Sequence, residues 1–288
     1  MTRILIVVAL AAGLLLGWLL LTGASRSPAS LQPESQPAQL ALPLRQAGQA
    51  RTYVVLMRAD GGFRFDPPAL RLEPGDSVLW FNLGDNHSTT AYHPANRKAG
   101  KVRAELRIPP GAKPWDSGIL GIGDKGLTFE RTFQIQGTYD YYCLPHEFLG
   151  MVGRLVVGQP GGPAEEKPLS AGLSKAAQQK MPSTALVMTG LGNWAAEINQ
   201  VLFQVFQQDH PGALKQVKAL LAAYRAGQGQ ANSLYAVLQR SGAQGQFAEL
   251  LAQYGKLLQI QGSFEELSQQ ADQLKTILTQ AGERLATR

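Results

Sequence analysis

Cysteine and histidine are scarce in this chain, with one cysteine (Cys143) and four histidines among 288 residues. A single cysteine excludes a binuclear copper centre bridged by two thiolates, and it excludes the C-x-x-C-H attachment motif of a c-type haem. Four histidines are also too few for a substrate-binding copper cluster if two of them are ligands of a separate mononuclear metal site. Charged residues make up only 17% of the chain, which is typical of a globular protein with a low-charge surface.

The net charge of +6 shows no concentration in any one part of the sequence, because residues 1–50, 51–158 and 159–288 share it evenly. A nucleic-acid-binding surface would gather its basic residues on one face or stripe, so we expect no nucleic-acid partner. One local basic cluster consists of Arg97, Lys98, Lys101, Arg103, Arg107 and Lys113. It either steers an acidic redox partner or is an ordinary solvated surface.

The single cysteine lies in a run that carries three possible metal ligands, Tyr141-Tyr142-Cys143-Leu144-Pro145-His146-Glu147-Phe148-Leu149-Gly150-Met151. Two imidazoles, one thiolate and a weak axial thioether are the ligands of blue-copper electron-transfer sites. The second imidazole must come from upstream, and His87 suits this role better than His93. An isolated buried cysteine is usually a small hydrophobe, but this combination at this spacing predicts a copper site. Its ligands are His87, Cys143, His146 and Met151.

On these residues, the stretch 51–158 resembles a cupredoxin of the plastocyanin, pseudoazurin and azurin group. The resemblance implies an all-β Greek-key sandwich with one type 1 copper ion and an electron-transfer role. It makes His146 the ligand at the solvent edge and Met151 the axial ligand. One residue departs from the pattern: Ser88 follows the upstream histidine, where plastocyanin-like chains carry an asparagine that ties two ligand loops together. The hydrogen bonds around the ligands are therefore expected to differ.

Short runs rich in Val, Ile, Phe and Tyr, separated by Gly, Pro and Asp, predict the strands of this sandwich. The expected strands are 51–57, 77–82, 102–108, 127–135, 138–142 and 152–157. Both the run lengths and the frequent turns fit a sandwich or barrel of one domain.

Residues 183–288 are rich in Ala, Leu and Gln and carry apolar stripes at helical spacing. They predict a separate all-α bundle of four or five helices, with a capping box at Ser263 and Glu266. We expect no metal site there. The bundle has three possible roles, namely to bind a partner, to associate with a second copy, or to orient the copper domain.

The N-terminal residues predict export. Residues 4–21 form an uninterrupted apolar run after Arg3, which is long for a cleaved signal peptide and barely long enough for a membrane anchor. Both readings of residues 1–24 place the rest of the chain in the periplasm or elsewhere outside the cytoplasm, and the run length favours an anchor. Residues 25–50, rich in Pro, Gln, Ser and Ala, are expected to be a tether, and residues 159–182 a second linker.

The functional expectation is a one-electron carrier rather than an enzyme. Redox partners are expected to dock at an apolar collar around His146, formed by Leu144, Pro145, Phe148 and Leu149, unless Phe148 and Leu149 pack inward as core. An alternative is a copper-delivery protein whose helical region recognises a client. A ligand loop built for burial, with only one of the five methionines close to it, favours electron transfer.

Overall fold

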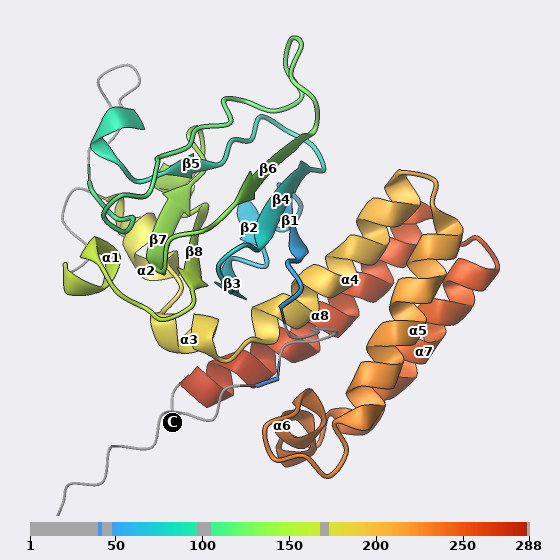
Figure 1. The fold of residues 1–288 in the computed structure, drawn as a ribbon. Coiled ribbons are helices and arrows are strands. Elements are labelled where there is room, and N and C mark those ends of the chain that lie inside the picture. Colours follow the sequence, from blue (N-terminus) through green and yellow to red (C-terminus); the bar gives the residue numbers. More distant parts are fainter. Residues whose placement is uncertain (1–39, 42–47, 97–104, 168–172, 287–288) are drawn as a thin grey trace, which may run out of the picture. The chain divides into compact units, whose positions relative to one another are not determined.

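The computed structural model describes residues 40–41, 48–96, 105–167 and 173–286. Within these ranges, eight strands form two four-stranded sheets (Figure 1). Their order is β2-β1-β4-β6 in the first sheet and β3-β8-β7-β5 in the second. The strands are β1 (Thr52–Arg58), β2 (Arg64–Asp66), β3 (Ala69–Leu72), β4 (Ser77–Asn82), β5 (Thr90–Ala91), β6 (Thr128–Thr132), β7 (Gly137–Tyr142) and β8 (Val152–Val157). The predicted cupredoxin-like sandwich is confirmed.

Strand pairing brings the two ends of the cysteine-containing loop together. β7 and β8 are antiparallel neighbours, and Tyr142 pairs with Val152 at the end of this ladder. Cys143 and Met151 therefore leave the sheet side by side. β1–β4 and β3–β8 are parallel pairs, whereas the other pairs are antiparallel.

β1 is buried on both faces. Tyr53, Val55 and Met57 pack into the core between the two sheets, while Val54 and Leu56 belong to a core shared with the helices. Side chains alternate between the two faces of a strand, and a strand covered on both faces is a continuous apolar run. This explains why residues 53–57 show no polar alternation.

Most predicted strands lie where expected, but one does not. The limits of β4 and β8 agree with the prediction, and β1, β6 and β7 differ only at their ends. The strand predicted over 102–108 is wrong for residues 105–108, which contain none, and 102–104 lie outside the described residues. Pro109 and Pro110 follow this segment and have no backbone N–H to donate to a neighbouring strand. Arg107 directs its buried side chain toward Asp140. Residues 105–108 therefore do not form a strand. The short strands β2, β3 and β5 carried no clear pattern.

The C-terminal part is helical, as predicted. The helices are α1 (Pro163–Glu166), α2 (Lys175–Lys180), α3 (Thr184–Met188), α4 (Leu191–Phe206), α5 (His210–Ala226), α6 (Leu234–Arg240), α7 (Gln244–Gln259) and α8 (Phe264–Ala286), with short 3₁₀ turns η1 (Pro94–Asn96) and η2 (Glu147–Leu149). The four long helices pack in the order α4-α5-α7-α8, with α8 returning to α4. The predicted apolar faces of these helices are buried or partly buried, except at Phe206 at the end of α4, which is 48% exposed. The predicted capping box forms, since the Ser263 amide donates to Glu266 Oε2 at 2.8 Å and the Glu266 amide donates to Ser263 Oγ at 3.2 Å.

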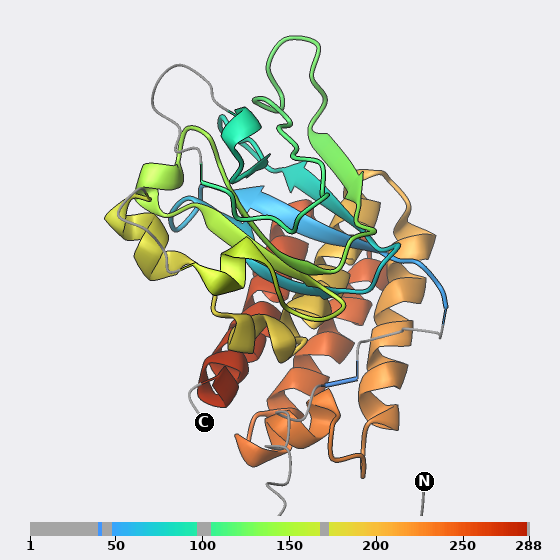
Figure 2. The ribbon, with the colours of Figure 1, turned by 60° about the vertical axis from the view of Figure 1, so that its left-hand side comes forward.

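The helical region packs directly on the first sheet. α4 lies against β1, with α8 beside α4, as Figures 1 and 2 show. Trp194 and Ile198 of α4 share one apolar core with Val54 and Leu56. Asn199 adds hydrogen bonds from its amide nitrogen to the backbone oxygens of Val54 and Asp66, at 3.3 and 2.7 Å. The independence of 51–158 and 183–288 as folding domains stays a prediction.

The two predicted linkers differ in how much of them the structure describes. Residues 159–182 contain α1 and α2, which contact β7 and η2 respectively. In the stretch 25–50, Leu40 is buried against the helical core. The predicted signal or anchor at 4–21 lies outside the described residues. Within the part of the chain that is described, no helix combines the length and apolar character needed to cross a membrane.

Candidate metal centre

Three of the four predicted ligands meet at one end of the sandwich. His87 lies between β4 and β5, and its carbonyl accepts a hydrogen bond from the Leu120 amide at 2.8 Å. Cys143 follows β7, and His146 precedes η2. The potential ligand atoms of these three residues lie within 4.8 Å of one another. His93, the alternative upstream histidine, instead accepts a hydrogen bond at Nδ1 from the Ala95 amide.

The three ligand atoms form a nearly regular triangle. Cys143 Sγ lies 3.7 Å from His87 Nδ1 and 3.6 Å from His146 Nδ1, and the two nitrogens are 3.2 Å apart. The centre of such a triangle is about 2 Å from each atom, close to metal–nitrogen and metal–sulfur bond lengths in proteins. The residues therefore fit a trigonal thiolate-and-imidazole metal site.

The protonation states of these groups also suit a metal ion. Burial, and next the charge of His146, lowers the pKa of His87 to about 4, and burial lowers the pKa of His146. Both imidazoles are thus neutral at pH 7, and each can offer a lone pair. Burial raises the pKa of the Cys143 thiol to about 12. The thiolate consequently needs a bound cation, which deprotonates a coordinating thiol, so metal binding releases a proton.

Ser88 ties the two ligand segments together. Its amide donates to Cys143 Sγ at 3.3 Å, and its Oγ accepts a hydrogen bond from the Leu144 amide at 2.7 Å. A donor to the sulfur favours the thiolate over the thiol. Ser88 thus links the His87 segment to the Cys143 loop through both its backbone amide and its hydroxyl. These are the hydrogen bonds formed where plastocyanin-like chains carry an asparagine.

Met151 lies at the other end of the loop and is fully buried. Its carbonyl accepts from the Cys143 amide at 3.0 Å, and its amide donates to the His146 carbonyl at 3.1 Å. The backbone of Met151 is thereby fixed beside the three clustered ligands. Its role as the axial ligand stays a prediction.

Phe63 is a residue of the site that the sequence did not reveal. It lies in the turn between β1 and β2, and its ring stacks on the His146 imidazole with 3.8 Å between centroids and 11° between planes. No motif surrounds Phe63 except the preceding Gly61-Gly62, which only indicates a turn. The stacking covers one face of the more exposed histidine.

α2 braces the ligand loop from outside. Ser174, the N-cap of α2, donates from Oγ to the Glu147 carbonyl and from its amide to Glu147 Oε1, each at 3.0 Å. Lys180 Nζ donates to the Leu149 carbonyl at 3.1 Å. The predicted linker therefore contributes a helix that holds η2, the turn between His146 and Met151.

Gly150 is required at the contact with α2. Its φ is +85°, and a Cβ there would lie 2.9 Å from the Ala176 carbonyl oxygen. We expect Gly150→Ala to lower the free energy of unfolding by about 2–3 kcal/mol, because left-handed strain of about 1–2 kcal/mol adds to overpacking. Urea denaturation measures this.

Gly242→Ala is the matched control for that variant. Gly242 has φ +73°, but nothing lies within 4 Å of an added Cβ. Only the backbone strain then applies. Equal losses of stability in the two variants would show that α2 does not constrain the loop.

Comparisons with known proteins relate part of this chain to copper-binding proteins. The sequence profile described as "Copper binding proteins, plastocyanin/azurin family" matches residues 53–158. Halocyanin from Natronomonas pharaonis is 30% identical over 112 residues, covering 39% of this chain and 59% of halocyanin. A plastocyanin from Nostoc punctiforme is 30% identical over 112 residues, covering 38% of this chain and 77% of that protein. Pseudoazurin from Methylobacterium extorquens matches structurally with 25% identity and a TM-score of 0.35, covering 45% of this chain and 92% of pseudoazurin.

A β-sandwich with two imidazoles and a thiol gathered at one end defines a mononuclear metal protein. With a 30%-identical plastocyanin covered over more than two thirds of its length, the chain belongs to the plastocyanin/azurin family of copper-binding proteins. Its cofactor is accordingly a single type 1 copper ion. The family match ends at residue 158, before α1. The chain spans 59% of halocyanin and 57% of pea plastocyanin, which is less than two thirds of either.

Proposed function

We propose that this protein is an exported one-electron carrier whose copper ion is held by His87, Cys143, His146 and Met151. The observation that carries the proposal is the triangle of Cys143 Sγ and the two Nδ1 atoms. Copper bound there supplies cycling between Cu(II) and Cu(I), taking one electron from a donor redox protein and passing it to an acceptor.

The surrounding residues support electron exchange rather than catalysis. Ser88 and α2 fix the ligand segments, so little has to move when the charge changes. His87 is fully buried, whereas His146 is partly exposed. His146 is therefore the ligand through which an electron enters or leaves.

Redox partners are proposed to dock on the apolar collar around His146. Phe148 is 63% exposed and Leu149 is 38% exposed, while Leu144 and Pro145 are partly buried. Exposed apolar patches tend to be interaction sites, and weak redox encounters use small interfaces. The collar therefore suits brief contact with a partner.

Phe148→Glu tests the collar without knowledge of the partner. Two copies of the protein that exchange an electron would meet through their collars. In the variant, the two glutamates would repel each other and the apolar contact would be lost. We therefore expect the rate of electron self-exchange to fall about tenfold, which corresponds to weakening of the encounter by about 1.4 kcal/mol. Magnetic resonance of a mixture of oxidised and reduced protein measures the rate. Ile260→Glu is the control, since Ile260 is 75% exposed at the C-terminal end of α7. An unchanged rate in Phe148→Glu would exclude the collar as the docking surface.

The proposed location is the periplasm or another extracytoplasmic compartment, with residues 4–21 as the export signal or membrane tether. Donor and acceptor are then redox proteins of that compartment or its membrane. The helical region is available for a partner or a second copy, in addition to its packing on the sandwich. Fractionation of cells followed by detection of the protein in the periplasmic and membrane fractions tests this location.

The alternative is copper delivery to a client. Burial of His87 and Cys143 weighs against it, because rapid transfer of copper requires accessible ligands. The visible absorption spectrum of the purified protein with one equivalent of Cu(II) tests the proposed site. We expect an intense visible thiolate-to-copper band that disappears on addition of ascorbate. A colourless protein, or a weak band that ascorbate does not affect, would contradict the proposal.

A further inference from the structure

The turn that carries Phe63 is held by polar contacts and not by packing alone. A cavity of about 570 Å³ lies between this turn and α8, lined by Gly61, Gly62 and Phe63 on one side and by Asp272 and Thr276 on the other. Because the cavity borders the turn, no closely packed side chains constrain the position of the turn on this side. The Phe63 ring packs against the core of the sandwich, and polar contacts add to this packing in holding the turn that carries it.

Arg58 supplies the first of these interactions. It ends β1 and is only 4% exposed, yet it is bound on two sides. Its Nε donates to Asp60 Oδ1 at 2.8 Å, and its Nη2 donates to the other oxygen of Asp60. Asp60 belongs to the turn, so the Arg58 guanidinium binds the turn to the end of β1.

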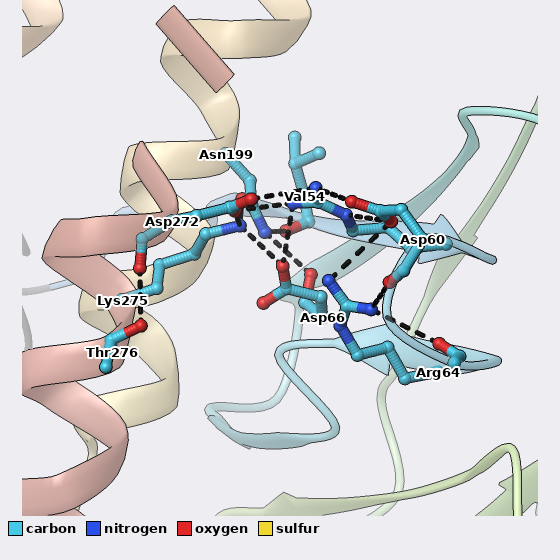
Figure 3. A network of polar contacts seen from close by, with 10 residues as sticks. Val54, Asp60, Arg64, Asp66, Asn199, Asp272, Lys275 and Thr276 are labelled. Carbon is cyan, nitrogen blue, oxygen red and sulfur yellow. Dashed lines mark hydrogen bonds and ion pairs between the residues drawn. The ribbon is translucent and has the colours of Figure 1, made fainter. Parts of the chain in front are cut away.

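α8 holds Arg58 in this position. Asp272 accepts from Arg58 Nη1 at 2.5 Å and from Nη2 at 2.8 Å. Lys275, one turn further along α8, contacts Asp272 at 3.0 Å and also contacts Asp66, the last residue of β2. Figure 3 shows Asp272 and Lys275 reaching from α8 toward Asp60 and Asp66. Paired, charge-assisted hydrogen bonds of this kind fix geometry as well as adding energy.

Arg64 completes the connection to Phe63. Its Nη1 donates to the backbone carbonyls of Asp60 and Gly62, the latter at 3.2 Å. Within the turn, the Gly62 amide donates to the Ala59 carbonyl at 3.1 Å. Asp60 is thus held through its side chain and its carbonyl, and Gly62, directly before Phe63, is held through its backbone amide and carbonyl.

We propose that Asp272 is a positioning residue through which the helical region sets Phe63 against His146 and thereby raises the reduction potential of the copper site. The proposal rests on the copper site proposed above. The Phe63 ring keeps water from one face of the imidazole. A site that is less hydrated disfavours the form with the higher charge, which is Cu(II), and so favours Cu(I). Releasing the ring should therefore lower the potential.

The decisive variant is Asp272→Asn, because its direct and indirect effects have opposite signs. Removing a negative charge would by itself destabilise Cu(II) and raise the potential. Loss of the Arg58 anchor frees Phe63, and we expect the potential to fall instead. The Cu(I)-to-Cu(II) ratio at a fixed solution potential should decrease by up to about tenfold, which is about 59 mV for one electron.

The double variant Asp272→Asn with Phe63→Leu separates the two routes. If Asp272 acts through the ring, it has no further lowering effect once the ring is gone. Gln270→Ala is the control on the same helix, since the Gln270 side chain donates to the Leu250 carbonyl of α7, away from the sandwich. It should leave the potential unchanged. A raised potential in Asp272→Asn, or the same lowering with and without Phe63, would overturn the proposal.

Nuclear magnetic resonance of the metal-free protein tests the positioning independently of copper. A ring stacked at 3.8 Å shifts the carbon-bound proton signals of His146 upfield. We expect Asp272→Asn to move these signals toward those of Phe63→Leu, with Gln270→Ala unchanged. Unshifted signals in a folded Asp272→Asn protein would refute the proposal, even if copper binding itself failed.

Discussion

Replacing Cys143 by serine is expected to abolish the intense visible absorption completely. The band arises from charge transfer between a thiolate and Cu(II), and a hydroxyl cannot supply it. Serine also provides a harder and much less acidic ligand, so the affinity for Cu(I) should fall by several orders of magnitude. Absorption spectroscopy and competition with a Cu(I) chelator measure the two effects.

Two histidine variants sharpen this result. His87→Ala should also remove the band, because its Nδ1 lies 3.2 Å from that of His146 and 3.7 Å from Cys143 Sγ. His93→Ala should preserve it, because His93 Nδ1 binds the Ala95 amide outside the triangle. A blue Cys143→Ser protein, or loss of colour in His93→Ala alone, would contradict the assignment of the ligands.

Replacing Asp140 by alanine is expected to cost about 3–5 kcal/mol of unfolding free energy, the usual effect of removing one partner from a buried ion pair. Asp140 lies in β7, three residues before Cys143, and is fully buried. Its carboxylate accepts hydrogen bonds from Arg107 Nε and Arg154 Nε, both at 2.7 Å. Without it, two buried guanidinium groups lose the carboxylate to which both donate hydrogen bonds. Denaturation in urea measures the loss.

Glu130→Ala is the matched control for Asp140→Ala. It also removes a carboxylate from a strand, but Glu130 on β6 is exposed and its hydrogen bond joins it to the exposed Thr52 hydroxyl. We expect a change within about 0.5 kcal/mol. Similar losses in both variants would show that the Arg107–Asp140–Arg154 cluster does not stabilise the sandwich.

The proposed copper ligands could be picked out from the sequence because three of them lie in one short segment. Cys143, His146 and Met151 occupy a single loop, so their spacing in the sequence reflects their spacing in space. The fourth ligand required one choice between two upstream histidines, His87 and His93. Ser88 marked a departure from the plastocyanin pattern, but only the fold shows that its hydroxyl accepts from the Leu144 amide.

The contribution of the helical region could not be read from the sequence in the same way. Phe63 meets His146 through a turn far away in the chain, and no local pattern encodes such a contact. The unbroken apolar run of residues 53–57 is the pattern of a strand covered on both faces, but it does not show which segment covers the outer face. α2 lies in a segment with the composition of a linker, and Asp272 is a charged residue of a helix in which such residues usually face solvent. Neither pattern indicates a contact with the copper domain.

One measurement tests the central claim most directly, namely a redox titration of the protein carrying one copper per chain. We follow the visible band while the solution potential is cycled, with a Cu(I) chelator present to capture released metal. The account predicts a reversible one-electron curve with full recovery of the band over repeated cycles. Loss of Cu(I) to the chelator on each reduction, with no recovery of the band, would contradict electron transfer and favour copper delivery.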